Sequence, residues 1–439
     1  MLSVLQLFFR QRFLLITALL LAVLQLQSCN KPTEPAKESI SVTVEDISCT
    51  EAWIRISDNN YSGNVTIVVK RDDTDALTIN LNNADTIVVD DGLLPNKAYT
   101  FKAVKMMGSN LIEASKPVTA VTLDTTSHNF TWQTFEFGEH GNSVLYDVAI
   151  IDENNIWAVG EIYMKDSLGN YDHNAYNAVH WDGQSWKLKK IGNQGGWPCR
   201  TVFAFAANDV WFEGTIKWDG DKYTVHMNGW PLLPNGDGWR VNKMWGSSSN
   251  DLYAVGDGGN IAHWNGSSWK KIESGTEKDI DDIFGNNGEI LCVTFRLFSM
   301  QSVEIIRIKE NNSTEKMSTN NLPLSMRSIW FIKDKKYYLV GDGIFSKTGE
   351  NLLNKNWEKV EGIQPNYYSN SIDGTGYNDI IVCGAFGEII HYNGFSWKNY
   401  LVNTLLTNGS YYAVKKKGNK VIVVGESDRK GIITVGEKD

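Results

Sequence analysis

The polar run DSLGNYDHN, residues 166–174, places several oxygen-bearing side chains close together in the chain. Carboxylate and amide oxygens are the ligands that Ca²⁺ prefers, and the run offers Asp166, Asn170, Asp172 and Asn174. Their spacing does not follow that of a known calcium loop, so a solvated polar hairpin is the competing interpretation. We predict no cofactor and keep Ca²⁺ as the one candidate ion.

Aromatic side chains outside the regular strands are a second group that could bind a ligand. Their flat apolar faces suit a sugar ring or a peptide, particularly beside acids and amides. They are Trp197, Trp230, Trp239, Tyr163, Tyr171, Tyr176 and Tyr367. The competing interpretation is structural, because Trp197 and Trp239 could also plug a channel mouth.

Motifs for enzymatic catalysis are missing from the sequence. It contains no His-Glu-x-x-His, no Gly-x-Ser-x-Gly and no phosphate-binding loop. His180, His263 and His391 recur at one position of a repeated pattern, which favours a structural role. We therefore predict no catalytic residue.

The repeated pattern supplies the elements that would position these residues. One signature is NNIWAVG, NDVWFEG, NDLYAVG and NDIIVCG, with weaker copies KKYYLVG and NKVIVVG and a degenerate copy, GEILCVT. A second follows most copies: HWDGQSW, KWDGDKY, HWNGSSW and HYNGFSW. The spacing is about 40–45 residues, which is the length of a four-stranded propeller blade. Asp-Gly and Asn-Gly pairs suit the tight turns between strands.

Seven copies predict a seven-bladed β-propeller over residues 129–439. The last copy stops before any Trp-led outer strand, whereas TWQTFEF, residues 131–137, is such a strand with no blade before it. We predict that this segment pairs with the last blade near Ile432 and Ile433 and closes the ring, which removes two exposed sheet edges.

The repeats resemble those of bacterial propellers related to neuraminidase-type, or Asp-box, repeats and to photosystem II assembly-factor repeats. The resemblance implies a propeller and raises one enzymatic alternative, a degenerate sialidase-type glycoside hydrolase. That enzyme would need an arginine triad, a Tyr/Glu pair and an acid/base Asp. The propeller arginines are Arg200, Arg240, Arg296, Arg307, Arg327 and Arg429. Clustering of Arg200, Arg240, Arg296 or Arg327 with carboxylates decides whether this alternative survives.

Residues 39–124 read as a small β-sandwich that precedes the propeller. Seven short alternating strands are separated by turn residues. The segment LLPNKAYTFKA, residues 93–103, resembles the tyrosine corner of fibronectin type III domains, which implies that the Tyr99 hydroxyl bonds to upstream backbone. The predicted fold is therefore all-β, a fibronectin III-like sandwich followed by a propeller.

The N-terminus reads as a targeting segment. Residues 1–28 hold a basic start and an apolar run, and LQSC, residues 26–29, resembles a bacterial lipobox. That resemblance implies cleavage before Cys29, acylation of Cys29 with palmitate-type chains, and attachment to a lipid bilayer. Residues 29–38 form a polar linker. Asn30 in place of Asp favours the outer membrane, so we expect a cell-envelope lipoprotein, periplasmic or surface-exposed.

Charge and cysteine content narrow the function further. The formal net charge is −9, which argues against nucleic-acid binding because no counterions would be released. Cys49, Cys199, Cys292 and Cys383 are scattered and are predicted to be buried free thiols. We expect a non-enzymatic recognition or assembly module whose ligand is a polysaccharide or an envelope protein.

Overall fold

The computed structural model describes residues 39–63, 65–192, 196–295, 302–349, 356–363 and 365–438. The predicted signal segment and Cys29 lie outside this range. The chain divides into two compact units, and Val118–Asp439 falls wholly in the larger one. Within the described ranges, no helix is long and apolar enough to cross a membrane.

The N-terminal strands form two antiparallel sheets. One holds β1, β2 and β5, and the other holds β3, β4, β6, β7 and β8. Their bounds are β1 (Ile40–Ile47), β2 (Ala52–Asp58), β3 (Val65–Arg71), β4 (Thr74–Leu81), β5 (Asp85–Asp90), β6 (Ala98–Met107), β7 (Asn110–Ala114) and β8 (Val118–Val121). The described part of this region has one strand more than the seven predicted. The extra strand is β7, which forms a tight hairpin with β6 at Gly108, a residue with a φ of 59°.

The expected tyrosine contact is present in this region. The backbone N–H of Leu94 donates a hydrogen bond of 2.9 Å to the Tyr99 hydroxyl. The Tyr99 side chain is buried, so the contact satisfies a hydroxyl that would otherwise lose its bonds with water.

Seven four-stranded antiparallel sheets follow one another along the rest of the described chain. We number them from first to seventh in chain order. The first four are β10 (Val144–Asp152), β11 (Asn155–Ile162), β12 (Tyr176–Trp181) and β13 (Trp186–Lys189); β14 (Val202–Ala206), β15 (Asp209–Phe212), β16 (Ile216–Trp218) and β17 (Tyr223–Val225); β18 (Val241–Ser248), β19 (Asp251–Gly256), β20 (Asn260–Trp264) and β21 (Trp269–Glu273); and β22 (Ile280–Asn286), β23 (Glu289–Thr294), β24 (Ile305–Ile308) and β25 (Thr314–Met317).

The remaining sheets repeat this order. They are β26 (Met326–Ile332), β27 (Lys336–Gly341), β28 (Gly343–Thr348) and β29 (Glu358–Lys359); β30 (Ser369–Gly376), β31 (Asp379–Gly384), β32 (Ile389–Tyr392) and β33 (Trp397–Asn399); and β34 (Gly409–Lys417), β35 (Lys420–Ser427), β36 (Lys430–Lys438) and β9 (Phe130–Phe137). Two short helices are described, η1 (Asp257–Gly259) and α2 (Leu401–Thr404).

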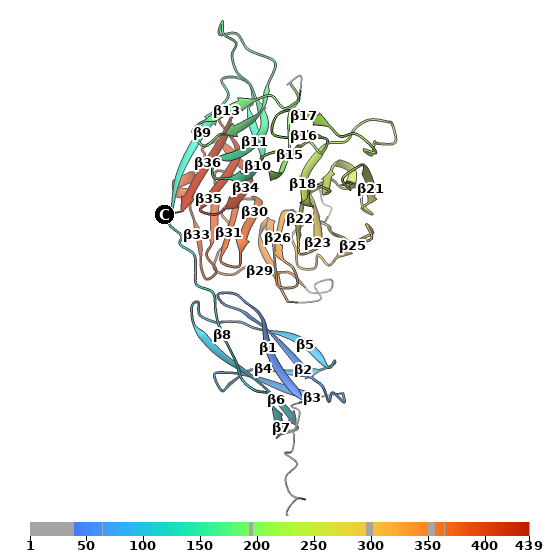
Figure 1. The fold of residues 1–439 in the computed structure, drawn as a ribbon. Helices are drawn as coiled ribbons and strands as arrows, with labels where there is room; N and C mark the ends of the chain where they lie inside the picture. The colour runs from blue at the N-terminus through green and yellow to red at the C-terminus, as the bar shows by residue number, and fades with distance from the viewer. Residues whose placement is uncertain are drawn as a thin grey trace, which may run out of the picture. The chain divides into compact units, whose positions relative to one another are not determined.

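The sheets form a closed circle (Figure 1). The first strand of each sheet contacts the first strand of the next, and β34 of the seventh contacts β10 of the first. Buried apolar clusters lie between neighbouring sheets, as in the group that joins Val148 and Ala158 to Ile422 and Val424. Each sheet therefore buries both faces against its neighbours, which is the packing of a β-propeller.

Strand β9 closes the circle. It pairs with β36 over its whole length, and Glu136 faces Ile432 while Phe135 faces Ile433 (Figure 1). The predicted pairing of the N-terminal strand with the last repeat is thus confirmed. The indole of Trp132 covers Gly436, where any Cβ would collide with the ring. A glycine opposite an aromatic residue lets the ring fold across the partner strand.

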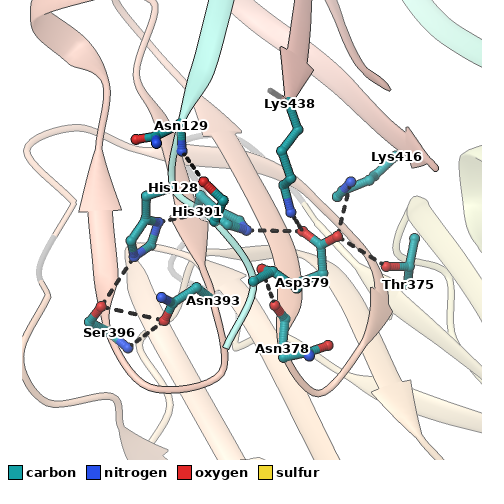
Figure 2. A network of polar contacts seen from close by, with 12 residues as sticks. His128, Asn129, Thr375, Asn378, Asp379, His391, Asn393, Ser396, Lys416 and Lys438 are labelled. Atoms are coloured by element: carbon teal, nitrogen blue, oxygen red, sulfur yellow. Dashed lines mark hydrogen bonds and ion pairs between the residues drawn. The ribbon is translucent and has the colours of Figure 1, made fainter. Parts of the chain in front are cut away.

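A polar network fixes the segment that enters β9 (Figure 2). The His128 and His391 rings lie nearly perpendicular to each other, with their Nδ1 atoms 2.8 Å apart. His391 Nε2 lies 2.9 Å from the Asp379 carboxylate, which also forms ion pairs with Lys416 at 3.0 Å and Lys438 at 3.2 Å. The closure thus joins β9 to the sixth and seventh sheets by polar contacts as well as by strand pairing.

The four cysteines beyond the N-terminal segment, Cys49, Cys199, Cys292 and Cys383, are free and buried. This confirms the prediction made from their scattered positions. Burial raises the pKa of the Cys292 and Cys383 thiols, so these cysteines are unreactive apolar side chains of the core.

Candidate functional site

A cavity of about 520 Å³ lies in the centre of the ring, at one end of the first strands. We call it the cup. Strands of six of the seven sheets line it, and Arg200 lies just before the second sheet. The lining residues are Tyr146, Asp147, Arg200, Arg240, Asn242, Lys243, Asp279, Asp281, Asp282, Phe295, Arg327, Ser328, Asn370, Ser371, Tyr412 and Ala413. Arg200 and Arg240 lie just before first strands, and Phe295 follows a second strand. The cup therefore opens on the face of the ring where first strands begin and second strands end.

A β-bulge that recurs in six sheets supplies many of the side chains that line the cup. In six of the seven described sheets the pairing between first and second strands skips one residue near the start of the first strand. The skipped residues are Tyr146, Asn242, Asp281, Arg327, Asn370 and Tyr412, and all six line the cup. A bulge turns an unpaired side chain away from its ladder, and here it turns each one toward the channel.

The bulge also explains the glycine that ends the repeated signature. Gly256 faces Val241, next to the bulge, and a Cβ on Gly256 would collide with the carbonyl oxygen of Arg240. A Cβ on Gly160 would collide in the same way with the carbonyl oxygen of Val144, and one on Gly425 with that of Ser410. The fourth sheet has Thr294 at this position, whose hydroxyl accepts a hydrogen bond from the Glu304 N–H.

Buried polar contacts tie the sheets together beneath the bulge residues. Lys243 Nζ lies 2.6 Å from Asp147, which is 2% exposed, and Asp147 also accepts a hydrogen bond of 3.0 Å from Thr201. Similarly, the Ser328 hydroxyl donates a hydrogen bond of 2.6 Å to Asp282 in the preceding sheet. These contacts fix the floor of the cup, so the cavity is preformed.

One wall of the cup is a chain of internally satisfied polar groups. Arg327 lies 3.2 Å from Asp281 and donates a hydrogen bond of 2.6 Å to Asn370. Asn242 donates to Asp281 at 3.4 Å, and Arg240 pairs with Asp257 at 2.8 Å. Burial raises the pKa of Asp281, and Arg327 opposes that shift. Both arginines on this wall already have anionic partners.

The opposite wall holds two tyrosines and Arg200. The rings of Tyr146 and Tyr412 are 6.3 Å apart, and the Arg200 guanidinium lies 4.5 Å from the centre of the Tyr146 ring. Tyr146 donates a hydrogen bond of 2.7 Å to Glu161, and Tyr412 donates one of 2.9 Å to Glu426. Burial and these hydrogen bonds raise the pKa of both phenols, so they stay protonated.

Arg200 differs from the other arginines of the cup. Among the described residues no carboxylate forms an ion pair with it, and the nearby Glu213 contacts the backbone N–H groups of Arg200 and Thr201 instead. Burial raises the pKa of Glu213 to about 7, so this acid carries only part of a charge at neutral pH. Arg200 is therefore a cation held in place by an aromatic ring.

The structure brings together three of the four arginines that the sialidase-type alternative was expected to cluster. Arg200, Arg240 and Arg327 line the cup together with four aspartates. Arg307 instead pairs with Glu289 and Glu315, and Arg429 lines a separate cavity. Arg296 lies outside the described residues.

The seven aromatic residues predicted to bind a ligand do not gather in one place, and none appears among the described residues that line the cup. Trp230 and Trp239 stack on each other with ring centres 4.9 Å apart, and Trp239 is 8% exposed. Trp197 is 80% exposed. Trp239 belongs to the buried apolar cluster that includes Trp211 and Trp269.

The predicted tyrosines lie at separate points. Tyr163 donates a hydrogen bond of 2.9 Å to Glu161, and Tyr171 lies 4.4 Å from the His140 ring. Tyr176 packs beneath Lys190, with its ring centre 4.8 Å from Nζ. Tyr367 lies against Phe386, with ring centres 4.6 Å apart, beside a second cavity of about 300 Å³.

The candidate calcium residues are engaged with their own loop. Asp166 accepts hydrogen bonds of 2.8 Å from the N–H groups of Leu168 and Asn170, and Asp172 accepts one from Asn174. In the described part of the chain, no three His, Cys, Asp or Glu side chains are grouped as a metal site. The Asp166 carboxylate thus accepts the backbone hydrogen bonds of a tight turn.

The recurring histidines bond to the residue that begins the second strand of their own sheet. His180 Nε2 lies 2.9 Å from Asn155, and His263 Nε2 lies 2.7 Å from Asp251. In the second sheet a lysine takes the same place, with Lys217 at 2.9 Å from Asp209. This pairing supports the structural role expected for the histidines.

Sequence reasoning missed most of the cup. The available signal was a polar or aromatic residue at one position of the otherwise apolar first strand, as at Tyr146, Asn242 and Asn370. The arginines were noticed, but their convergence depends on the ring geometry.

Comparison with known proteins supports the fold. No protein-family model and no curated protein matches the chain. The solved structure "YCF48 bound to D1 peptide" is similar over 72% of this chain and 99% of its own, with 16% identity and a TM-score of 0.53. YCF48 from Cyanidioschyzon merolae is similar over 70% of this chain and 98% of its own, with 14% identity and a TM-score of 0.51.

A third solved structure, BamB from Moraxella catarrhalis, is similar over 76% of this chain and 91% of its own, with 12% identity and a TM-score of 0.37. At the identities of the two YCF48 structures the likeness shows the fold alone, which is an all-β propeller.

Proposed function

We propose that this chain is an envelope-anchored lipoprotein whose seven-bladed propeller is a non-enzymatic recognition or assembly module for a protein ligand. Acylated Cys29 would hold it to the outer membrane, and the fibronectin III-like region would be a spacer. The seven four-stranded sheets would be the blades of the propeller. The cup carries the proposal, because a rigid recess built by repeated bulges is a preformed binding site.

A protein ligand is favoured over a polysaccharide by the chemistry of the cup. One wall is already hydrogen-bonded to itself, so a polyhydroxylated ring would find few free partners there. A solved propeller of similar fold is described as bound to a peptide, which supports the idea that such a ring accommodates a chain segment.

A degenerate sialidase-type hydrolase is the second candidate, because Arg200, Arg240 and Arg327 share the cup with aspartates. Two observations weigh against it. Arg240 and Arg327 are neutralised by Asp257 and Asp281. The raised pKa of both cup tyrosines makes a tyrosine nucleophile unfavourable. Incubation with a fluorogenic sialoside should release no product, and turnover above buffer would establish the hydrolase.

The module is tested by selecting peptides from a display library on the purified mature chain, alongside a glycan array. Asn242→Trp would fill the cup, and Val402→Trp places the same side chain at a position that is 96% exposed and outside the cup. We expect selected peptides to lose binding to the Asn242→Trp variant only, with both variants folded by circular dichroism. Equal binding to both variants, or binding of glycans alone, would overturn the proposal.

A further inference from the structure

The two walls of the cup differ in what they leave for a ligand. On the wall formed by the third to sixth sheets, Arg240 and Arg327 each pair with an aspartate and donate to an asparagine. On the wall formed by the seventh, first and second sheets, Arg200 has no ion-pair partner among the described carboxylates. An incoming anion therefore meets its strongest unpaired donor at Arg200.

The position of the Arg200 guanidinium is fixed before any ligand binds. It lies over the face of the Tyr146 ring at 4.5 Å, and Tyr146 is itself held by a hydrogen bond to Glu161. Arg200 also forms a side-chain hydrogen bond with Tyr146. A guanidinium has five N–H donors, so others remain for two parallel hydrogen bonds to a carboxylate. Little side-chain entropy is lost when such a preorganised group binds.

Apolar surface lies beside this cation. The Tyr146 and Tyr412 rings are neighbours, and Phe295, which also lines the cup, lies against the Arg327 guanidinium at 5.1 Å. The tyrosine hydroxyls are occupied by Glu161 and Glu426, and the Arg200 guanidinium covers one face of Tyr146. Apolar contact is therefore offered by the Tyr412 ring and by the part of the Tyr146 ring that Arg200 leaves uncovered. A ligand that fits this wall combines one carboxylate with an adjacent apolar group.

We infer that the cup binds the C-terminal end of a polypeptide, with the terminal carboxylate on Arg200 and the last side chain against Tyr146 and Tyr412. This inference rests on the proposed function and names its ligand. A sugar acid offers the same carboxylate, but its ring hydroxyls would face a wall whose donors and acceptors are already paired with one another. A chain end with an apolar side chain leaves fewer of its own polar groups unsatisfied.

The test compares N-acetyl-leucine, which mimics a C-terminal residue, with N-acetyl-leucinamide, which lacks only the carboxylate. Dissociation constants are measured on the full mature chain by saturation-transfer NMR at low salt. We expect the amide to bind about ten- to a hundredfold more weakly, since a charge-assisted pair is lost. Arg200→Gln should weaken the acid by a similar factor, and Arg200→Lys by less because the charge remains.

Matched controls separate this inference from general electrostatics and from the proposed function. Arg429→Gln removes an arginine outside the cup and should leave binding unchanged. Equal affinity for acid and amide, an equal loss in the Arg429→Gln variant, tighter binding of glucuronic acid, or no binding at millimolar acid would each overturn the inference. If selected peptides still lose binding to Asn242→Trp while acid and amide bind alike, the proposed function stands and only the C-terminal assignment fails.

Discussion

Acid should loosen the closure of the ring through His128. Its ring faces His391, Lys398, Lys438 and the Ser396 hydroxyl, and each cationic or protonated neighbour opposes a charge on the imidazole (Figure 2). Burial first, and then His391, Lys398 and Lys438, lower the pKa of His128 from 6.5 to about 4, against a smaller opposing effect of the hydrogen bond with Ser396. The folded state therefore prefers the neutral ring.

The sign of the pH effect follows from this shift. Above the unfolded pKa of 6.5 the ring is neutral in both states, and the full stability is present. As the pH falls from 6.5 toward 4, the unfolded chain takes up the proton and the folded chain does not, so stability is lost. The shift limits the loss to about 3 kcal/mol, and we expect about 1–2 kcal/mol because His128 is only half-buried.

The perturbation is His128→Gln, which keeps an amide donor for His391 but removes the titrating ring. Urea unfolding is followed by tryptophan fluorescence for both proteins, at about pH 8 and about pH 4.5. Other histidines, such as His180, also have a lowered pKa, so the informative quantity is the stability difference between the two proteins. That difference should move by about 1–2 kcal/mol in favour of the variant at the lower pH.

A pH-independent difference would refute this reasoning. It would mean that the folded propeller tolerates a protonated His128, for example because the Ser396 hydroxyl rotates to accept a hydrogen bond from the imidazolium. Loss of the closing strand itself is read separately, from protection of the β9 amides against hydrogen exchange. We expect those amides to exchange faster at the lower pH in the wild-type chain than in the variant.

Three further predictions follow from the ring and its anchor. Gly256→Ala should destabilise the propeller by about 3 kcal/mol or more in urea unfolding, because the new methyl group collides with the Arg240 carbonyl, whereas Gly376→Ala, whose Cβ would have 3.7 Å to its nearest neighbour, should cost about 1 kcal/mol or less. Lys243→Met should cost about 3–5 kcal/mol because it leaves the buried Asp147 carboxylate without its cation, and a cost below 1 kcal/mol would contradict the role given to this pair. Cys29→Ser should move the protein from the membrane to the soluble fraction in cell fractionation, and unchanged membrane association would refute acylation at Cys29.

The closure and the thiols could be predicted because each has a local signal. The strand TWQTFEF has the character of the outer strand that the last repeat lacks, and pairing with β36 is observed. The scattered positions of Cys49, Cys199, Cys292 and Cys383 predicted buried free thiols, which the structure shows.

The cup could not be predicted in the same way. Each bulge is set by a hydrogen-bond register, and a single residue such as Asn242 or Asp281 carries no motif that marks it. Residues more than two hundred positions apart, such as Tyr146 and Tyr412, become neighbours only when the ring closes. Large aromatic residues were predicted to bind the ligand instead, but Trp230 and Trp239 pack on each other.

The most direct test of the bulge-built cup as the ligand site is a crystal structure of the chain soaked with N-acetyl-4-bromophenylalanine. The bromine atom gives an anomalous signal that locates the side chain independently of interpretation. We predict a bromine peak against the Tyr146 and Tyr412 rings, with the carboxylate on the Arg200 guanidinium. Bromine peaks confined to other surfaces, or a carboxylate bound on the Arg327 wall with Arg200 unoccupied, would contradict it.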